Sequence, residues 1–289
     1  MTRKPIVAGM FYKDNFEELD EQINYCFKED KFGPGDVPIS TRDKEIIGVI
    51  APHAGYAYSG GGQAWCYKEI RESKVADVYV VIGTNHTSLK TCLTIEDFET
   101  PFGVVRIDNE FIETLMNHSK IIENKETHNH EHSIEVQLPF LQFVNRDYLK
   151  NMKIVPILVS SDIKYEDLAR AIVETATELD KKICVICSSD FTHYGINYSY
   201  MPFHDNVQEE MRKLDGGAIG FIKEFDSFGF VNYVEETGAT ICGYSSIAVL
   251  IEIAKLMKSS KVEVMQYYTS GDVTKDYSSA VGYGSVVVR

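Results

Sequence analysis

The sequence is poor in basic residues, and it contains neither a long apolar run nor a dense set of cysteines. Its 289 residues include 29 Lys and Arg against 43 Asp and Glu, which gives a formal net charge of −14. No basic block offsets this charge, so a nucleic-acid partner is not expected, because phosphates would be repelled. Since no run of about 18 apolar residues occurs, a membrane span is not expected either.

The N-terminal residues, MTRKPIVAGMFYKDN, begin with basic side chains. They lack the apolar core of about 7–15 residues that a secretion signal requires, so a cytoplasmic protein is expected. The six cysteines, at positions 26, 66, 92, 184, 187 and 242, show no regular spacing. In a cytoplasmic chain they are interpreted as free thiols. Cys184 and Cys187 form a CxxC inside a predicted strand, where residues three apart point to opposite faces, so packing in the core is favoured over redox pairing.

The pattern of apolar segments predicts an α/β fold. Strand-like runs at 46–52, 75–85, 153–160 and 182–189 alternate with helical patterns at 14–30, 59–73 and 164–180. Such alternation predicts a central, mostly parallel or mixed sheet flanked by helices on both faces. No repeat, low-complexity tract or linker divides the chain, so one domain over residues 1–289 is predicted.

The remaining segments complete this prediction. Two strands around Thr100 and Pro101 predict a local antiparallel excursion, and Pro139 must lie in the first turn of its helix or at a kink. Further helices are predicted at 109–118, 133–149, 204–214, 216–224, 227–236 and 244–258, and closing strands at 262–271 and 279–288.

Three predicted strands end beside a side chain that could bind a metal. The runs at 46–52, 75–85 and 182–189 are followed by His53, His86 and Asp190. Ligands of open α/β sheets bind outside the carboxyl ends of the strands, so these residues predict one convergent polar site. His193 lies three residues after Asp190, and the carboxylate could orient this ring and fix its tautomer. Taken alone, His53 would be interpreted as an ordinary hydrogen-bonded loop histidine.

A histidine-rich segment, THNHEHSIE (127–135), supplies further candidates. His128 and His130 are interpreted as members of a solvated loop. His132 and Glu135, spaced i and i+3 at the start of a predicted helix, are predicted to reach the pocket.

Cys242 precedes a predicted helix, where the thiolate form is favoured, and one more buried thiol is the alternative. The glycine-rich segment APHAGYAYSGGG contains neither GxxxxGK[ST] nor GxGxxG, which argues against a nucleotide site. Two serines precede Asp190, but no GxSxG elbow occurs, so a Ser/His/Asp hydrolase remains a minor alternative.

Six motifs occur in order between residues 8 and 246: AGMFYKD, APHAGYAYSG, IGTNH, EHSIEVQLPF, SSDFTHYG and TICGYSS. The series resembles the Memo family over essentially the whole chain. This resemblance implies the fold of the LigB-type class III non-haem iron extradiol dioxygenases, with a cleft at the sheet edge. It further implies that the metal ligands are His53, His86 and Cys242. The additional pocket residues that it implies are Asp190 and His193, and the aromatic residues lining the cleft are Phe11 and Tyr58.

The chain departs from the animal members of this family in two places. It has GTNHT where they carry paired histidines and CGYSS where they carry CGRHP, so it resembles an archaeal or bacterial-type member. The role of the animal proteins in receptor signalling and cell motility is therefore not carried over. The three implied ligand positions, in contrast, all match.

The donor set implied for the metal favours particular ions and functions. Two imidazoles and a thiolate suit iron, copper or zinc better than magnesium or calcium. The dioxygenases use two histidines and a carboxylate, and Cys242 in place of the carboxylate moves the site toward one-electron redox chemistry or metal carriage.

Two functions follow from this site. The first is a metal-dependent oxidoreductase with iron or copper, in which His193 acts as acid or base and Asp190 orients it. The second is a non-catalytic peptide- or ligand-binding or metal-handling protein built on a former dioxygenase site, with Phe11 and Tyr58 contacting the ligand. A hydrolase with a metal-activated water is a third alternative. The resemblance also implies association with radical SAM proteins.

Overall fold

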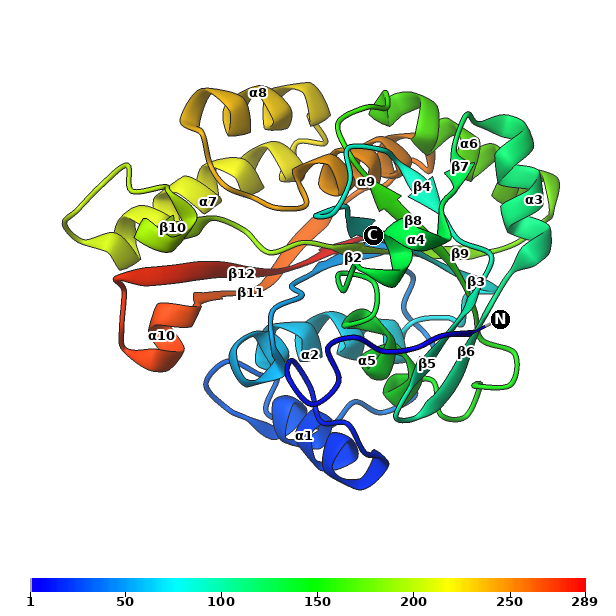
Figure 1. Ribbon diagram of the computed structural model, residues 1–289, viewed down its shortest axis with the longest axis horizontal. Helices are drawn as coiled ribbons and strands as arrows, with labels where there is room; N and C mark the ends of the chain where they lie inside the picture. Colours follow the sequence, from blue (N-terminus) through cyan, green and yellow to red (C-terminus); the bar gives the residue numbers. More distant parts are fainter. Residues whose placement is uncertain (1) are drawn as a thin grey trace.

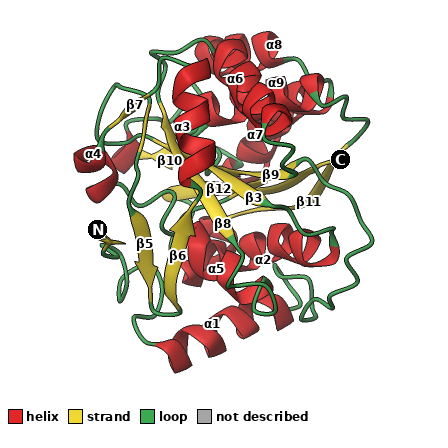
Figure 2. Ribbon diagram, turned by 90° about the vertical axis from the view of Figure 1, so that its right-hand side faces the viewer, coloured by secondary structure: helices red, strands yellow, loops and turns green. Residues whose placement is uncertain are grey.

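The computed structural model describes residues 2–289, and in it helices cover both faces of one mixed sheet (Figures 1 and 2). Four parallel strands form the centre of the sheet in the order β8 (Lys153–Val159), β3 (Val78–Thr84), β9 (Ile183–Ser188) and β2 (Gly48–Ala51). Every residue of β2, β3 and β9 is buried, which explains their nearly continuous apolar sequences. The predicted single α/β domain is confirmed.

Further strands, some parallel and some antiparallel to their neighbours, extend both edges of this parallel centre. Next to β2 lies β12 (Ser279–Val288), which also pairs with β11 (Val262–Thr269) and β10 (His193–Gly195). Next to β8 lie β6 (Gly103–Ile107), β5 (Asp97–Thr100) and β1 (Thr2–Arg3), with β4 (Cys92–Leu93) and β7 (Ile122–Glu123) nearby. The antiparallel pair β5–β6 confirms the excursion predicted around Pro101.

Two groups of helices enclose the sheet (Figure 2). One face carries α2 (Tyr56–Glu72) with α1 (Phe16–Lys28) and α5 (Gln137–Val144). The other carries α6 (Tyr165–Glu178) and α9 (Tyr244–Leu256), with α3 (Asn109–His118), α7 (Val207–Lys223) and α8 (Ser227–Thr237) packed around them. Short helices α4 (Lys125–Asn129), η1 (Ile196–Tyr198) and α10 (Ser270–Thr274) lie in connections. Within residues 2–289, none of these helices combines the length and apolarity that a membrane crossing requires.

The glycine run of residues 60–62 lies inside helix α2 and not in a loop before it. A Cβ atom on Gly60 would lie 2.4 Å from Sγ of Cys26 in α1, so glycine is required for the close packing of the two helices. This glycine run therefore has a role in helix packing.

Other boundaries differ from the sequence prediction for local reasons. The helix predicted over 133–149 covers only α5, and Pro139 is its third residue, where no helical N–H is lost. The helices predicted at 204–214 and 216–224 are one helix, α7. Gly217 lies inside this helix and allows α8 to pack closely, because a Cβ atom there would lie 2.3 Å from the hydroxyl of Tyr233. Strand β11 ends at Thr269, which caps α10 in a capping box with Asp272.

Asp215, in the interior of α7, is fully buried and accepts hydrogen bonds from Thr192 and from the Tyr267 hydroxyl, the latter at 2.6 Å. Burial raises the pKa of Asp215 to about 6. Because the pKa of this carboxyl is higher in the folded state than its ordinary value of 3.8, its protonated form stabilises the folded protein, and this contribution is fully present below pH 3.8. This contribution is lost as the pH rises through about 6.

Replacing Asp215 by Asn should therefore remove a pH-dependent cost. We expect the free energy of unfolding of D215N, relative to that of the wild type, to increase by on the order of 2 kcal/mol as the pH rises from 4 to 7. Urea unfolding of both proteins at several pH values in this interval measures the difference. Stability curves that run parallel across the interval would contradict this expectation.

Candidate metal centre

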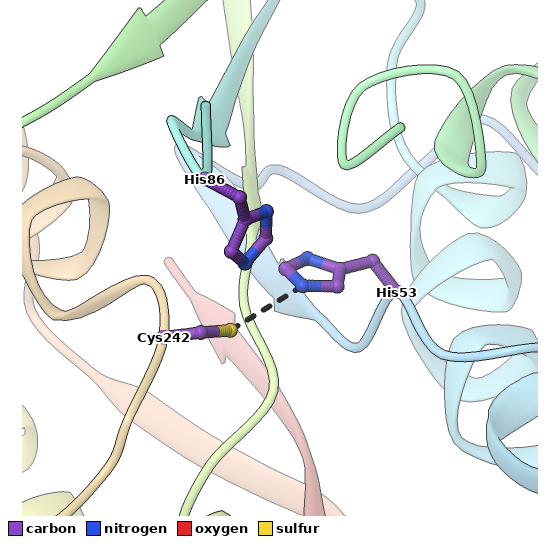
Figure 3. Close-up of side chains that lie close together, drawn as sticks. All are labelled: His53, His86 and Cys242. Carbon is purple, nitrogen blue, oxygen red and sulfur yellow. Dashed lines mark hydrogen bonds between the residues drawn. The ribbon is translucent and has the colours of Figure 1, made fainter. Parts of the chain in front are cut away.

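Three adjacent parallel strands direct polar side chains to one point at the edge of the sheet. His53 follows β2, His86 follows β3 and Asp190 follows β9, while Cys242 lies just before α9. Figure 3 shows His53, His86 and Cys242 converging from separate segments. One ligand atom from each lies within 4.8 Å of the others, and Nε2 of His53 is 3.3 Å from Sγ of Cys242.

Ser188 fixes the orientation of the His53 ring. Its hydroxyl donates to the carbonyl of Ser133 at 2.6 Å, so its lone pairs must receive the amide of Gln137 and Nδ1 of His53, at 2.9 and 3.0 Å. Nδ1 of His53 is therefore the protonated nitrogen and Nε2 carries the free lone pair. Burial, together with the neighbouring His86 and His132, holds the pKa of His53 well below its ordinary value. The ring is thus neutral and ready to bind a metal.

Glu131 holds the second imidazole. Both carboxylate oxygens lie 3.1 Å from Nδ1 of His86, which leaves Nε2 of this ring for Cys242. Burial opposes protonation of His86, but its hydrogen bonds with Cys242 and Glu131 outweigh this effect and raise its pKa to about 10. A metal ion that binds here must therefore displace a proton.

Asp190 and His193 take different partners from those predicted. Asp190 accepts the backbone N–H of His53 at 2.9 Å, and its own N–H donates to Sγ of Cys242 at 3.3 Å. Burial raises the pKa of Asp190. Nδ1 of His193 lies 3.0 Å from two carbonyls, those of Phe191 and Thr240, so it carries the proton and Nε2 is a free acceptor. These carbonyls, and not Asp190 as predicted, set the tautomer of His193.

A cavity of about 480 Å³ opens over these side chains. Aromatic side chains form much of its wall, which also includes hydroxyl groups and the carboxylates of Asp190 and Asp276. Its lining comprises Phe11, His53, Ala54, Gly55, Tyr58, His86, His132, Asp190, His193, Tyr198, Ser270, Thr274, Asp276, Ser279, Val281 and Tyr283. The predicted cleft residues Phe11, Tyr58 and His132 are thus all present, and the Phe11 and His132 rings meet edge to face at 5.0 Å.

Glu135 does not line this cavity, contrary to the sequence prediction. It is completely buried, and its carboxylate accepts hydrogen bonds from Arg3 and Tyr12, both at 2.7 Å, and from two backbone N–H groups of the N-terminal segment. Because residues 133–136 form a turn before α5 begins, the i and i+3 spacing does not place Glu135 beside His132 on one helical face. Its role is to hold the N-terminal segment against the histidine-rich loop.

The structure separates the two histidines that were assigned to a solvated loop. His130 is exposed, as expected, and lies 3.0 Å from Glu126. His128 is buried, so this part of the prediction is wrong. Its carbonyl accepts a hydrogen bond from Arg3 at 2.6 Å, and burial lowers the pKa of its ring to about 3. Alternate spacing cannot show which histidine the N-terminal segment covers.

Ser188 and Glu131 were not selected from the sequence, although both contact candidate ligands. The first serine of SSD and the acidic residue between two histidines were the available signals. Neither is specific, because serines and glutamates are common near the ends of strands and in loops. Only the distances to His53 and His86 reveal their roles.

These observations define a class of protein: an α/β domain with a candidate metal centre of two histidines and a cysteine at the carboxyl edge of its parallel strands. The family model described as "Memo-like protein" matches residues 3–287. A MEMO1 family protein of Methanopyrus kandleri is 40% identical, with 100% of this chain and 99% of that protein covered. Proteins of the same description from Methanobrevibacter smithii and Methanocaldococcus jannaschii are each 37% identical, covering 100% and 99% of this chain and 100% and 99% of their own lengths. The chain belongs to the Memo family.

Proposed function

We propose that this protein binds iron or copper through His53, His86 and Cys242 and uses the metal in an oxidoreductase reaction within the cavity. The observation that supports this most directly is the convergence of two imidazoles and one sulfur from three distant segments of the chain. The family resemblance extends the proposal to a cytoplasmic protein that associates with a radical SAM partner.

The distances and the donor types fit such an ion. Nitrogen and sulfur ligands at about 2.0–2.3 Å from one ion lie roughly 3.3–3.7 Å apart in a tetrahedral arrangement. The separation of 3.3 Å between His53 and Cys242 agrees with this range. A thiolate with two imidazoles is a soft donor set, which favours copper(I), zinc or iron(II) over calcium and magnesium. Zinc is the further candidate and would supply no redox chemistry.

The surrounding residues are suited to binding and proton transfer. A bound iron or copper ion, held by His53, His86 and Cys242, would supply a redox centre. The two carbonyls fix Nδ1 of His193 as a donor, so Nε2 is the nitrogen that this ring can present to a bound molecule in the cavity for proton transfer. The backbone N–H of Asp190 steadies the cysteine sulfur, and Phe11 and Tyr58 provide apolar surface that displaces water from a ligand.

A second candidate function is the capture of a peptide or small ligand, or the handling of metal, without catalysis. The aromatic wall supports it, since Phe11, Tyr58, Tyr198 and Tyr283 all face the cavity and Tyr58 is 46% exposed. Exposed tyrosine supplies contact area with little loss of side-chain freedom on binding. Such binding needs no metal, and this separates the two candidates.

Anaerobic purification followed by elemental analysis tests the proposal. We expect close to one equivalent of iron or copper, with oxygen-dependent turnover of catechols or thiols that disappears when the metal is removed and returns when it is restored. Ligand binding that survives metal removal, without turnover of either substrate class, would favour the second candidate. Activity with zinc alone would instead indicate metal-assisted hydrolysis.

A further inference from the structure

Glu131 is the most heavily used hydrogen-bond acceptor near the candidate metal centre, and its side chain is only 1% exposed. Its carboxylate accepts three backbone N–H groups, those of His86, His132 and Ser133, at 2.7, 2.7 and 2.8 Å. It also lies 3.1 Å from Nδ1 of His86 and 3.2 Å from Nδ1 of His132. One buried carboxylate thus contacts two imidazoles that lie on different segments.

This carboxylate is placed to orient the imidazoles and not to bind a metal itself. Glu131, His86 and His132 do present ligand atoms within 4.8 Å of one another. However, a metal ion on the carboxylate would compete with three backbone N–H groups, and each of these would lose its buried acceptor. Both Nδ1 atoms face the same anion, and an imidazole facing a carboxylate does so with its N–H.

We propose that Glu131 is a positioning residue that holds His86 and His132 with Nδ1 protonated, so that Nε2 of each ring is the nitrogen available to the cavity. The two rings are stacked, with centroids 5.3 Å apart and planes 17° apart, as expected for imidazoles anchored on one acceptor. His86 then directs Nε2 to Cys242, and His132 provides a second nitrogen acceptor on the cavity wall in addition to His193. The consequence for metal affinity rests on the proposed function, whereas the ring orientation does not.

The N-terminal segment fixes the loop that carries Glu131. Arg3 is 3% exposed, and its guanidinium donates to the carbonyl of His128 and to the carbonyl of Glu131, both at 2.6 Å. The same guanidinium pairs with Glu135 at 2.7 Å. These bonds hold the backbone on both sides of residue 130, so the carboxylate of Glu131 is held in place beneath His86.

The test uses the whole protein and the substitution Glu131→Gln. In the wild type without metal, nitrogen-15 NMR should show ring N–H signals at Nδ1 of both His86 and His132, protected from exchange with solvent. In E131Q the single amide oxygen cannot accept from both rings and from the three backbone N–H groups, so at least one of the two signals should lose its protection. Zinc affinity, measured against a competing chelator, should fall by about 10–100-fold.

Glu126→Gln is the matched control. Glu126 also pairs with a histidine of the same segment, His130, at 3.0 Å, but both side chains are exposed. E126Q should leave the ring signals of His86 and His132 and the zinc affinity unchanged.

The possible outcomes separate this proposal from the proposed function. A wild-type spectrum without protected N–H signals at Nδ1 of both rings would overturn it, even if E131Q did not fold. Unchanged ring signals in E131Q would overturn it as well. If the wild type binds no metal, but E131Q loses at least one of the protected signals, the metal function would be refuted and the role of Glu131 supported.

Discussion

Substitution of His53 by Ala is expected to abolish metal binding. The ring is 3% exposed, and burial together with the neighbouring histidines holds the pKa of His53 well below its ordinary value. Ser188 orients the ring so that Nε2 is directed at the cysteine sulfur. Loss of this ligand leaves one imidazole and one thiolate to hold the ion. Loss of a residue that only hydrogen-bonds to a ligand lowers metal affinity by about 10–100-fold, so loss of the ligand itself should lower it by more than about 100-fold. Anaerobic titration of iron(II) and copper(I) against competing chelators measures the loss.

A histidine far from the cavity provides the control for this experiment. His118, in α3, pairs with Glu178 of α6 at 2.6 Å and takes no part in the cavity. H118A should keep wild-type affinity. Because removal of a buried ring leaves space in the core, thermal unfolding of H53A should be measured beside the titration. A folded H53A protein that retains wild-type affinity would refute the proposed ligand set.

Substitution of Cys242 by Asp is expected to change which metal the protein prefers. The variant would carry two histidines and one carboxylate, the donor set of non-haem iron(II) oxygenases. Copper(I), which favours thiolate, should bind at least about 100-fold more weakly, while iron(II) affinity should stay within roughly tenfold of the wild type. The N–H of Asp190, which now donates to the sulfur, can donate to the new carboxylate and help to hold it in the same position.

Competition between copper(I) and iron(II) for each protein measures this exchange. Spectroscopy of the cobalt(II) derivative reports the same change, because the sulfur-to-metal absorption of the wild type should be absent in C242D. Cys242→Ser is the second variant to compare, since it removes the thiolate without adding a carboxylate and should weaken both metals. If C242D kept wild-type copper(I) affinity, Cys242 would not be a ligand.

Part of the candidate site follows from the sequence alone. His53, His86 and Asp190 each come directly after a buried strand, and the three strands are parallel neighbours, so their carboxyl ends meet at one edge. The inference succeeded because fully buried parallel strands have nearly continuous apolar sequences that are easily recognised. Cys242 was assigned through the family resemblance, because it follows no strand.

The position of Cys242 depends on a contact that no local pattern encodes. Gly243 packs against Ser189, and a Cβ atom on Gly243 would lie 2.4 Å from the Cβ of that serine. This close approach brings the segment before α9 against the end of β9 and places the sulfur beside His53. The same applies to the orientation of His193, which depends on the carbonyl of Thr240 in this segment.

By itself, the sequence determined the alternation of strands and helices, the edge at which polar side chains gather, and the membership of His53, His86 and Asp190 in that edge. These features follow from the periodicity of apolar residues, which is a local property of the chain. Tertiary structure alone decided that Glu131 anchors two imidazoles, that Glu135 and Arg3 fix the N-terminal segment, and that His128 is buried. Such hydrogen bonds join residues as far as 132 positions apart, and buried polar groups take whichever partner the packing of the sheet and loops brings within reach.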